Sequence, residues 1–283
     1  MKITYLLPFI AFCLITSSCS DDNDADLNMA VEIASNYEGY TSGVFTNSPT
    51  PIVTNGENLS ITANEDKTVN AIMTSNQWGT TTITNAIVSV GTNNSYIVAG
   101  EGTSTISMHG GTPSKYACVL TGAISADRKT AELTFTLPAV MGGTTIAFNL
   151  GSAPANLYIA GNFSGYSSAV FAYSPTPIVT EKESLTISAN DDETVHVVFE
   201  SNQWGTTTIT NAEITTEENG SFSLSGTGIS LMGMHGSEAK EYACQFTGII
   251  TADKSGADMS FILSVMGGTT ITFHVGEAPQ TEV

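Results

Sequence analysis

The sequence predicts an all-β protein with two tandem antiparallel β-barrels of about eight strands each, behind an N-terminal signal peptide. Three observations support this prediction: a long internal duplication, an alternation of apolar and polar residues, and the lack of a helical period beyond two turns. The chain has 283 residues, a length at which two domains are the natural expectation. A β-sandwich is the alternative architecture.

Residues 1–18 have the pattern of a signal peptide. Lys2 provides a short basic start, and an apolar run follows from Ile3 to Ile15. This run is shorter than the roughly 20 apolar residues that span a bilayer, and its length suits the core of a signal peptide. Cys19 follows small residues and resembles the acylated cysteine of a bacterial lipoprotein, although Thr16 replaces the usual leucine. The alternative is ordinary secretion.

The segment 19–30 is predicted to be an acidic tether behind the lipidated Cys19. It contains four aspartates between residues 21 and 26 and no aromatic residue, a composition typical of solvated chain. Its position resembles the surface-export signal of Bacteroidota lipoproteins. We therefore expect an outer-membrane lipoprotein that is exposed at the cell surface. Its partner is the membrane, to which the N-terminal lipid anchors it.

The charge balance excludes some partners. The chain has 27 Asp and Glu against 8 Lys and Arg, a formal net charge of −19. Nucleic acids and anionic lipid surfaces are recognised by clustered basic residues. We therefore expect no nucleic-acid partner. Four cysteines in a chain of this length do not indicate a disulfide framework.

The duplication divides the chain into two similar modules. Segment 39–54 recurs as 165–180, an offset of 126 residues, and 75–86 recurs unchanged as 201–212. A repeat of this length is a whole domain, because solenoid repeats have roughly 20–50 residues. The predicted domains are therefore 31–154 and 155–283.

Short strands are predicted throughout each module. Residues 270–275 alternate apolar and polar side chains, which is typical of a half-buried strand. Closing an antiparallel sheet into a barrel removes its exposed edges. In the second module about eight strands are predicted, with some of the following ranges merging or splitting: 157–162, 166–172, 177–180, 184–189, 194–200, 206–215, 220–231, 241–251 and 257–275.

An ordered set of motifs gives a family resemblance. Gly39-Tyr40 comes first, followed by W-G-x-x-x-I-x-N-A from Trp78 and Y-x-C-x-x-T-G-x-I from Tyr116, and each recurs in the second module. In this order, after a lipoprotein signal, the motifs resemble the calycin-like β-barrel lipoproteins of Bacteroidota. The resemblance implies lipocalin-type barrels, and a ligand-binding role only by analogy.

Aromatic residues are the candidate ligand-binding side chains. One tryptophan per module could stack on a sugar or line a barrel mouth, and the tyrosines could line a cavity. The alternative is that all of them are core residues, with each tryptophan closing a barrel end. The candidates are Tyr40, Trp78, Tyr116, Tyr166, Trp204 and Tyr242.

Metal, cofactor and catalytic sites are not predicted. His109 and His235 are equivalent, but a metal site needs three or four converging ligands. Cys118 and Cys244 are expected to be buried free thiols. The sequence has no motif of a serine hydrolase, zinc protease or P-loop enzyme. His196 and His274 are expected to face solvent.

Two functional hypotheses remain, and neither is enzymatic. The first is a carrier that binds a small apolar or amphipathic molecule inside one or both barrels. The second is an adhesion or scaffold module with solid barrel cores that binds glycan or protein by its outer surface. A hollow interior would favour the first hypothesis, and a filled interior would favour the second.

Overall fold

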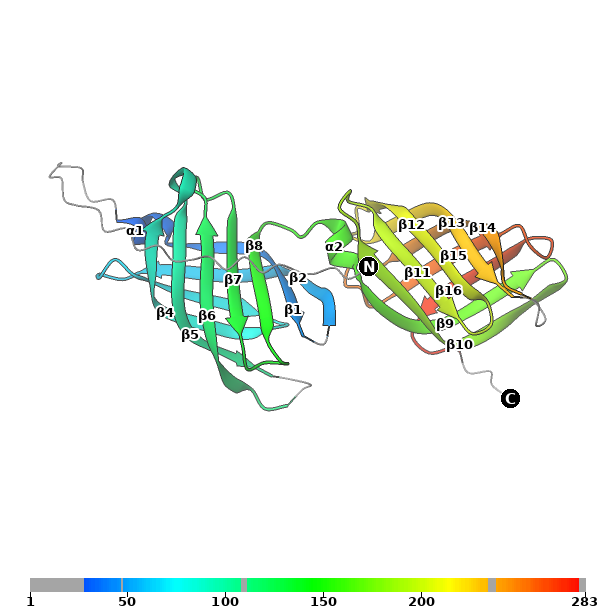
Figure 1. Ribbon diagram of the computed structural model, residues 1–283, viewed down its shortest axis with the longest axis horizontal. Helices are drawn as coiled ribbons and strands as arrows, with labels where there is room; N and C mark the ends of the chain where they lie inside the picture. Colours follow the sequence, from blue (N-terminus) through cyan, green and yellow to red (C-terminus); the bar gives the residue numbers. More distant parts are fainter. Residues whose placement is uncertain (1–27, 47, 108–110, 234–237, 280–283) are drawn as a thin grey trace.

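The computed structural model describes residues 28–46, 48–107, 111–233 and 238–279, and in these ranges it contains two closed eight-stranded β-barrels. In each barrel every strand pairs with the next strand along the chain, and the last strand pairs with the first. All the pairs are antiparallel. Figure 1 shows the two barrels side by side. The predicted fold class is therefore confirmed, and the sandwich alternative is wrong.

The first barrel follows a one-turn helix. Its elements are α1 (Met29–Ile33), β1 (Ser35–Phe45), β2 (Ser48–Ala63), β3 (Val69–Ser75), β4 (Gly79–Val90), the 3-10 turn η1 (Thr92–Asn94), β5 (Tyr96–Ile106), β6 (Ser114–Ile124), β7 (Ala131–Leu137) and β8 (Thr144–Leu150).

The second barrel repeats this order without a counterpart of η1. Its elements are α2 (Ala155–Ile159), β9 (Gly161–Phe171), β10 (Ser174–Ala189), β11 (Val195–Ser201), β12 (Gly205–Thr216), β13 (Phe222–Met232), β14 (Lys240–Ile250), β15 (Ala257–Leu263) and β16 (Thr269–Val275).

Four of the predicted strands differ from the structure. The expected strand at 157–162 is wrong in its first half, because residues 157–159 belong to the helix α2, and β9 begins at Gly161. The strands at 177–180 and 184–189 are parts of one long strand, β10, and the run 257–275 is the hairpin β15–β16. A helix of one turn is too short to show a 3.6-residue period.

The barrel interiors are filled with apolar side chains. Along β7, Ala131, Leu133, Phe135 and Leu137 are buried while the residues between them face outward, as the two-residue period of a strand requires. Each barrel has one cluster of buried apolar residues. In the second barrel Phe199, Phe246 and Phe261 pack with ring centroids 5.1–5.3 Å apart.

Each barrel has two different ends. At one end a one-turn helix closes the barrel: Ile33 and Ile159 are fully buried, and the hydroxyl of Tyr37 donates to the carbonyl of Ile33 at 2.7 Å. The opposite end carries Trp78 or Trp204, in the turn that follows β3 or β11. We call these the helix end and the tryptophan end.

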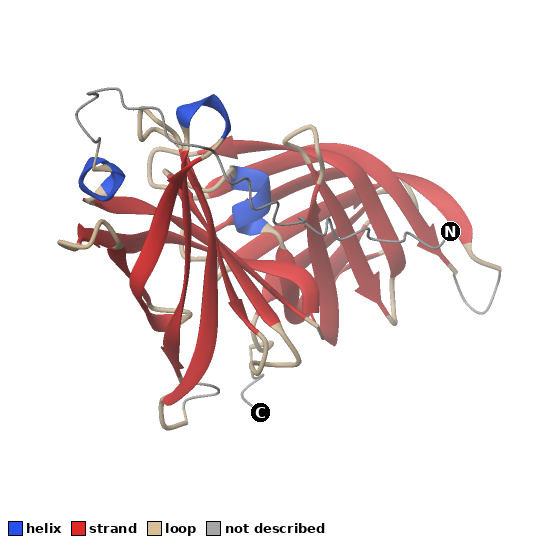
Figure 2. Cartoon of the chain, turned by 60° about the vertical axis from the view of Figure 1, so that its left-hand side comes forward, coloured by secondary structure: helices blue, strands red, loops and turns tan. Residues whose placement is uncertain are grey.

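The helix end of the second barrel rests on the outer wall of the first. α2 lies against β2, and β9 also approaches β2. The ammonium of Lys254 donates to the carbonyls of Val53, at 3.2 Å, and Tyr158, at 2.9 Å, and so joins the two barrels. Figures 1 and 2 show α2 at this junction.

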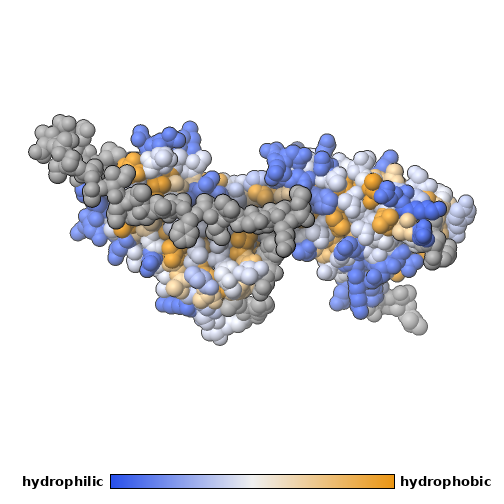
Figure 3. All heavy atoms as spheres, in the orientation of Figure 1, coloured by the Kyte–Doolittle hydropathy of each residue, from blue (hydrophilic) through white to orange (hydrophobic). Residues whose placement is uncertain are grey.

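The outer surface is mixed in character. On the face shown in Figure 3, apolar residues are scattered among polar ones. Single exposed apolar residues are normal on soluble surfaces. Among the described residues no helix is long and apolar enough to cross a membrane.

Candidate functional site

Both tryptophans are buried plugs at the tryptophan ends. Trp78 and Trp204 are only 2% and 5% exposed. In the first barrel the hydroxyl oxygen of Ser75 accepts hydrogen bonds from the backbone N–H groups of Gln77 and Trp78, at 3.1 and 2.9 Å. Ser201 does the same in the second barrel. The repeated Ser-Asn-Gln-Trp-Gly sequence is therefore a turn that folds the indole inward.

The glycine after each tryptophan is required by this turn. Gly79 and Gly205 have φ angles of +71° and +75°, a region that side chains rarely adopt. A Cβ atom on Gly79 would lie 2.1 Å from the carbonyl oxygen of Thr105. The turn conformation and the close approach of β5 therefore both exclude a side chain.

A carboxylic acid is buried inside each barrel, which the sequence analysis missed. Glu57 and Glu183 occupy equivalent positions and are each 2% exposed. Burial raises the pKa of both carboxyl groups, because desolvation disfavours the charged form. The hydroxyl of Ser75 opposes this effect at Glu57, and Ser201 and Ser167 oppose it at Glu183.

A β-bulge turns each glutamate inward. The pairing of β1 with β2 shifts by one residue at Gly56, and that of β9 with β10 shifts at Lys182. Both residues have positive φ, +72° and +61°. A bulge of this kind reverses which residues of the strand face inward. The two equivalent glutamates and the glycine before Glu57 were the available sequence signal.

The first barrel satisfies most of its buried polar groups. The Ser75 hydroxyl donates to Glu57 at 3.0 Å, and the Trp78 indole N–H donates to the Thr41 hydroxyl at 3.1 Å. Thr81 also bonds Ser104 at 2.8 Å. Among these groups only the second carboxyl oxygen of Glu57 has no partner.

The second barrel keeps the equivalent Thr207–Ser230 bond, at 2.9 Å, but satisfies the other groups poorly. Both carboxyl oxygens of Glu183, the hydroxyl of Ser167 and the indole N–H of Trp204 make no hydrogen bond of good geometry. Ser167 stands where the first barrel has Thr41. A threonine is stiffer about χ1 than a serine, so Thr41 holds its oxygen for the indole better. Unsatisfied buried polar groups are costly.

The predicted tyrosines lie in two different places. Tyr116 and Tyr242 are half-buried and pack against the core clusters. Tyr40 and Tyr166 lie on the outer wall, since their strands bury the alternate residues. The wall therefore separates Tyr40 and Tyr166 from the interior, and the six aromatic candidates do not share one cavity. Their role in ligand binding stays a prediction.

A small cleft lies at the tryptophan end of the first barrel. Its volume is about 250 Å³, and it is lined mainly by apolar side chains. The lining residues are Phe45, Ile52, Gln77, Trp78, Ile106, Ser107, Val140 and Met141.

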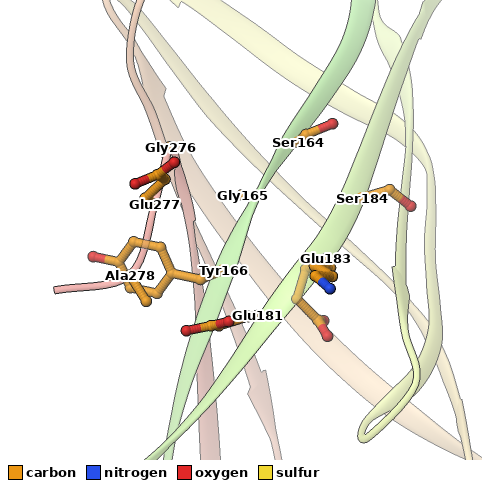
Figure 4. Close-up of a pocket in the computed structure, with 10 residues that line it drawn as sticks. Ser164, Gly165, Tyr166, Glu181, Glu183, Ser184, Gly276, Glu277 and Ala278 are labelled. Carbon is orange, nitrogen blue, oxygen red and sulfur yellow. The ribbon is translucent and has the colours of Figure 1, made fainter. Parts of the chain in front are cut away.

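A larger groove, of about 740 Å³, lies on the outer wall of the second barrel, beside the bulge in β10. Figure 4 shows residues from β9, β10 and the segment after β16 around it, including Tyr166, Glu181 and Glu277. The Tyr166 ring stacks on His274, with centroids 5.0 Å apart. His274 in turn contacts Asp258 at 2.6 Å.

The same region of the first barrel is covered. Val53 on β2 is 4% exposed, whereas its counterpart Val179 is 51% exposed. The backbone N–H of Ala153 donates to the side chain of Asn55 at 2.8 Å, so the chain between the barrels crosses this wall. The second barrel therefore covers the wall around Val53 on the first barrel, whereas its own equivalent wall around Val179 is exposed.

The cysteines and histidines form no reactive centre in the part of the chain that the structure describes. Cys118 and Cys244 are free and buried, as predicted, and desolvation raises the pKa of both thiols to about 11. No three metal-ligating side chains cluster among the described residues. Cys19, His109 and His235 lie outside them.

Comparisons with known proteins agree with this architecture. The solved structure of a "putative outer membrane protein" from Bacteroides fragilis NCTC 9343 is similar, with a TM-score of 0.65 and 23% identity, over 87% of this chain and 98% of that one. No curated protein matches the sequence. The profile of the calycin-like β-barrel domain matches residues 33–150 and 159–277. The chain therefore belongs to the calycin-like β-barrel domain family, with one domain in each barrel.

Proposed function

We propose that this protein is a surface lipoprotein of the outer membrane that acts as a non-enzymatic binding module for protein or glycan. In this proposal the outer walls of the barrels make the contacts, and the barrel cores are scaffolds. The observation that carries it is the contrast between interior and exterior. The interiors are filled by buried side chains, whereas the second barrel has a groove of about 740 Å³ on its outer wall.

Cavity size supports the outer wall over the interior. Pockets for small molecules usually have about 300–1,000 Å³ and enclose most of the ligand. The cleft beside Trp78, at about 250 Å³, falls below this range, and the outer groove falls within it. Met73 and Met259, which could have lined a hollow barrel, are fully buried.

The absence of enzymatic activity is part of the proposal. The buried carboxyl groups of Glu57 and Glu183 have raised pKa values but lie in different barrels, so they cannot act as a pair on one bond. With pKa values of about 11, Cys118 and Cys244 hold little of the nucleophilic thiolate at neutral pH.

The proposed location is supported by the N-terminal sequence and by the Bacteroides fragilis neighbour. The expected result is that the protein incorporates labelled fatty acid in its native host and that Cys19→Ala abolishes the incorporation. Protease added to intact cells is expected to degrade the anchored protein. Protection of the protein in intact cells but not in lysed cells would contradict surface exposure.

Native mass spectrometry tests the choice of outer wall over interior. The protein is purified gently from its own membrane, and the mass of the mature chain with its acyl groups is compared with that of the Cys19→Ala chain. We expect no further bound mass. A reproducible extra mass that matches a small apolar or amphipathic molecule, and is lost on unfolding, would overturn the solid-core proposal and identify the ligand class, whereas a bound glycan would not.

A carrier of a small apolar or amphipathic molecule is the second candidate. The apolar lining of the cleft at Trp78 favours it in the first barrel, and the unpartnered polar atoms around Glu183 favour it in the second. If the extra mass appears, Trp78→Phe and Glu183→Gln identify the barrel that holds it, because each change alters one site only.

A further inference from the structure

The contact between the two barrels has two halves, and each half has a second copy elsewhere in the chain. On the first barrel the contact uses the outer wall of β2 around Val53, which we call the docking wall. On the second barrel it uses α2 and the turn with Lys254, which we call the docking end. Because the modules are duplicates, β10 carries a second docking wall and α1 carries a second docking end.

The second copies expose the apolar residues that the contact covers. Val53 in the docking wall is 4% exposed, and its counterpart Val179 is 51% exposed. In the docking end Leu157 is half-buried, and its counterpart Val31 is 57% exposed. Both halves therefore keep an apolar residue at the equivalent position, even where no described residue covers it.

The basic residue of the docking end is also kept. Lys254 donates to the carbonyl of Tyr158, in its own helix, and to that of Val53 across the contact. Arg128 takes the place of Lys254 in the first barrel and donates in the same way to its own helix, at the carbonyl of Glu32, 3.1 Å away. A guanidinium has further N–H donors, which suit the carbonyl of Val179.

The charges of the two free halves differ from those of the joined halves in a complementary way. Asn55 in the joined wall becomes Glu181 in the free wall, and Ser255 in the joined end becomes Lys129 in the free end. The free wall also carries Lys182 and Glu277, and the free end carries Glu32 and Asp127. Relative to the joined halves, the free wall therefore gains an acidic residue and the free end gains a basic one.

We propose that copies of this protein associate head to tail, with the docking end of α1 in one copy seated on the docking wall of β10 in the next. This rests on the proposed function, in which outer walls bind partners, and names the partner as a second copy. The free wall borders the groove of about 740 Å³, because Glu181, Lys182 and Glu277 line this groove.

The geometry allows this association to continue beyond a dimer. The two free halves lie on different barrels, with α1 near the left-hand end of the left-hand barrel in Figure 1 and β10 in the right-hand barrel. A contact between different surfaces of identical subunits forms rings or filaments. Anchoring of every copy to one membrane would raise the effective concentration of the two halves.

Sedimentation velocity of the mature chain with Cys19→Ala, over a concentration series, tests the proposal. We expect a sedimentation coefficient that rises with concentration for this parent chain. Val31→Glu, which blocks the end, and Val179→Glu, which blocks the wall, are each expected to stay monomeric. Ile229→Glu is the matched control: it is 49% exposed, lies on β13 away from the groove, and should associate like the parent.

Mixing the two blocked variants gives the sharpest result. Val31→Glu keeps an intact wall and Val179→Glu keeps an intact end, so an equimolar mixture is expected to form dimers and nothing larger. This recovery also shows that both variants are folded. A parent chain that stays monomeric at every concentration, or blocked variants that associate as the parent does, would overturn the proposal.

Charge reversal provides an independent arm. Arg128→Glu is expected to weaken association, and adding Glu181→Arg in the same chain is expected to restore part of it, while added salt weakens the parent. If neither high salt nor Arg128→Glu changes the self-association of the protein, the proposed role of the docking end is contradicted. Failure of self-association would leave the solid-core result of native mass spectrometry unaffected, so the two proposals fail separately.

Discussion

The two barrels have the same strands and bulges, but they differ in what is left unpaired. Inside the first barrel, Thr41 accepts the indole N–H of Trp78 and Ser75 donates to Glu57. Inside the second, the indole N–H of Trp204 and both carboxyl oxygens of Glu183 make no hydrogen bond of good geometry, although Ser201 and Ser167 lie close enough to Glu183 to oppose the rise of its pKa. The outer walls differ too, because among the described residues Val53 is covered and its counterpart Val179 is exposed. Each contact in one barrel can therefore be compared with the equivalent position in the other barrel of the same chain.

The largest expected difference between the barrels comes from the docking wall. Val53→Glu places a charge in the buried contact, and we expect it to reduce the free energy of unfolding by about 2–3 kcal/mol or to separate the barrels. Val179→Glu, at the exposed counterpart, should change it by less than about 0.5 kcal/mol in the monomer. Thermal unfolding and small-angle scattering measure the two effects, and equal losses would contradict the covered wall.

The buried glutamates predict a pH dependence. Their folded-state pKa values lie above the ordinary value of 4.5, so the unfolded chain releases these protons at lower pH than the folded chain does. Stability should therefore fall as pH rises from 4.5 through the raised values, and stay low above them.

Replacing either glutamate by glutamine tests which barrel loses more stability by burying a carboxylate. Glu183→Gln should raise the stability at neutral pH by about 1–3 kcal/mol, because it removes a negative charge that burial disfavours. Glu57→Gln should raise it less, because Ser75 already bonds that carboxyl. Denaturation midpoints at acidic and neutral pH provide the measurement. A loss of stability at neutral pH in both variants would show that the charged form is favoured.

The tryptophan hydrogen bond predicts a smaller difference. Trp78→Phe and Trp204→Phe remove similar apolar volume, but only the first leaves a hydroxyl, that of Thr41, without its donor. We expect Trp78→Phe to cost about 1 kcal/mol more than Trp204→Phe. Ser167→Thr should then stabilise the parent chain, but not the Trp204→Phe variant, if the threonine aligns its oxygen with the indole. If Trp78→Phe and Trp204→Phe lower the stability equally, the hydrogen bond from Trp78 to Thr41 does not stabilise the first barrel.

The barrels themselves could be predicted from the sequence because the signals are long-range and redundant. The duplication showed two domains, and alternation such as that of 270–275 identified strands. The helix α2 escaped prediction because one helical turn has no measurable period, and residues 157–162 can alternate as a strand equally well. Local patterns are ambiguous at this length.

The buried polar residues could not be predicted, because the set of alternate residues that faces inward changes at the bulge within β2 and within β10. Counting alternate residues from Val53 would place Glu57 on the outer face together with it. The bulge at Gly56 or Lys182 reverses that assignment, and a lysine in the second module hides the glycine signal. Tyr40 and Tyr166 were candidates for a cavity, yet the same alternation places them on the outer wall.

The smallest expected effect is kinetic, and it compares how often each barrel opens. Cys118 and Cys244 are buried at equivalent positions, with pKa values of about 11, so a thiol reagent must wait for local or global opening. The unpartnered polar atoms of the second barrel should lower its opening free energy by about 1 kcal/mol, which makes the labelling of Cys244 about 5 times faster. Peptide mass spectrometry after timed labelling separates the two sites.

Glu183→Gln should remove the difference, since it relieves the penalty in that barrel alone, whereas Glu57→Gln should widen it by slowing Cys118. If Cys118 reacts faster in the parent chain, the satisfied polar network does not make the first barrel the more stable one.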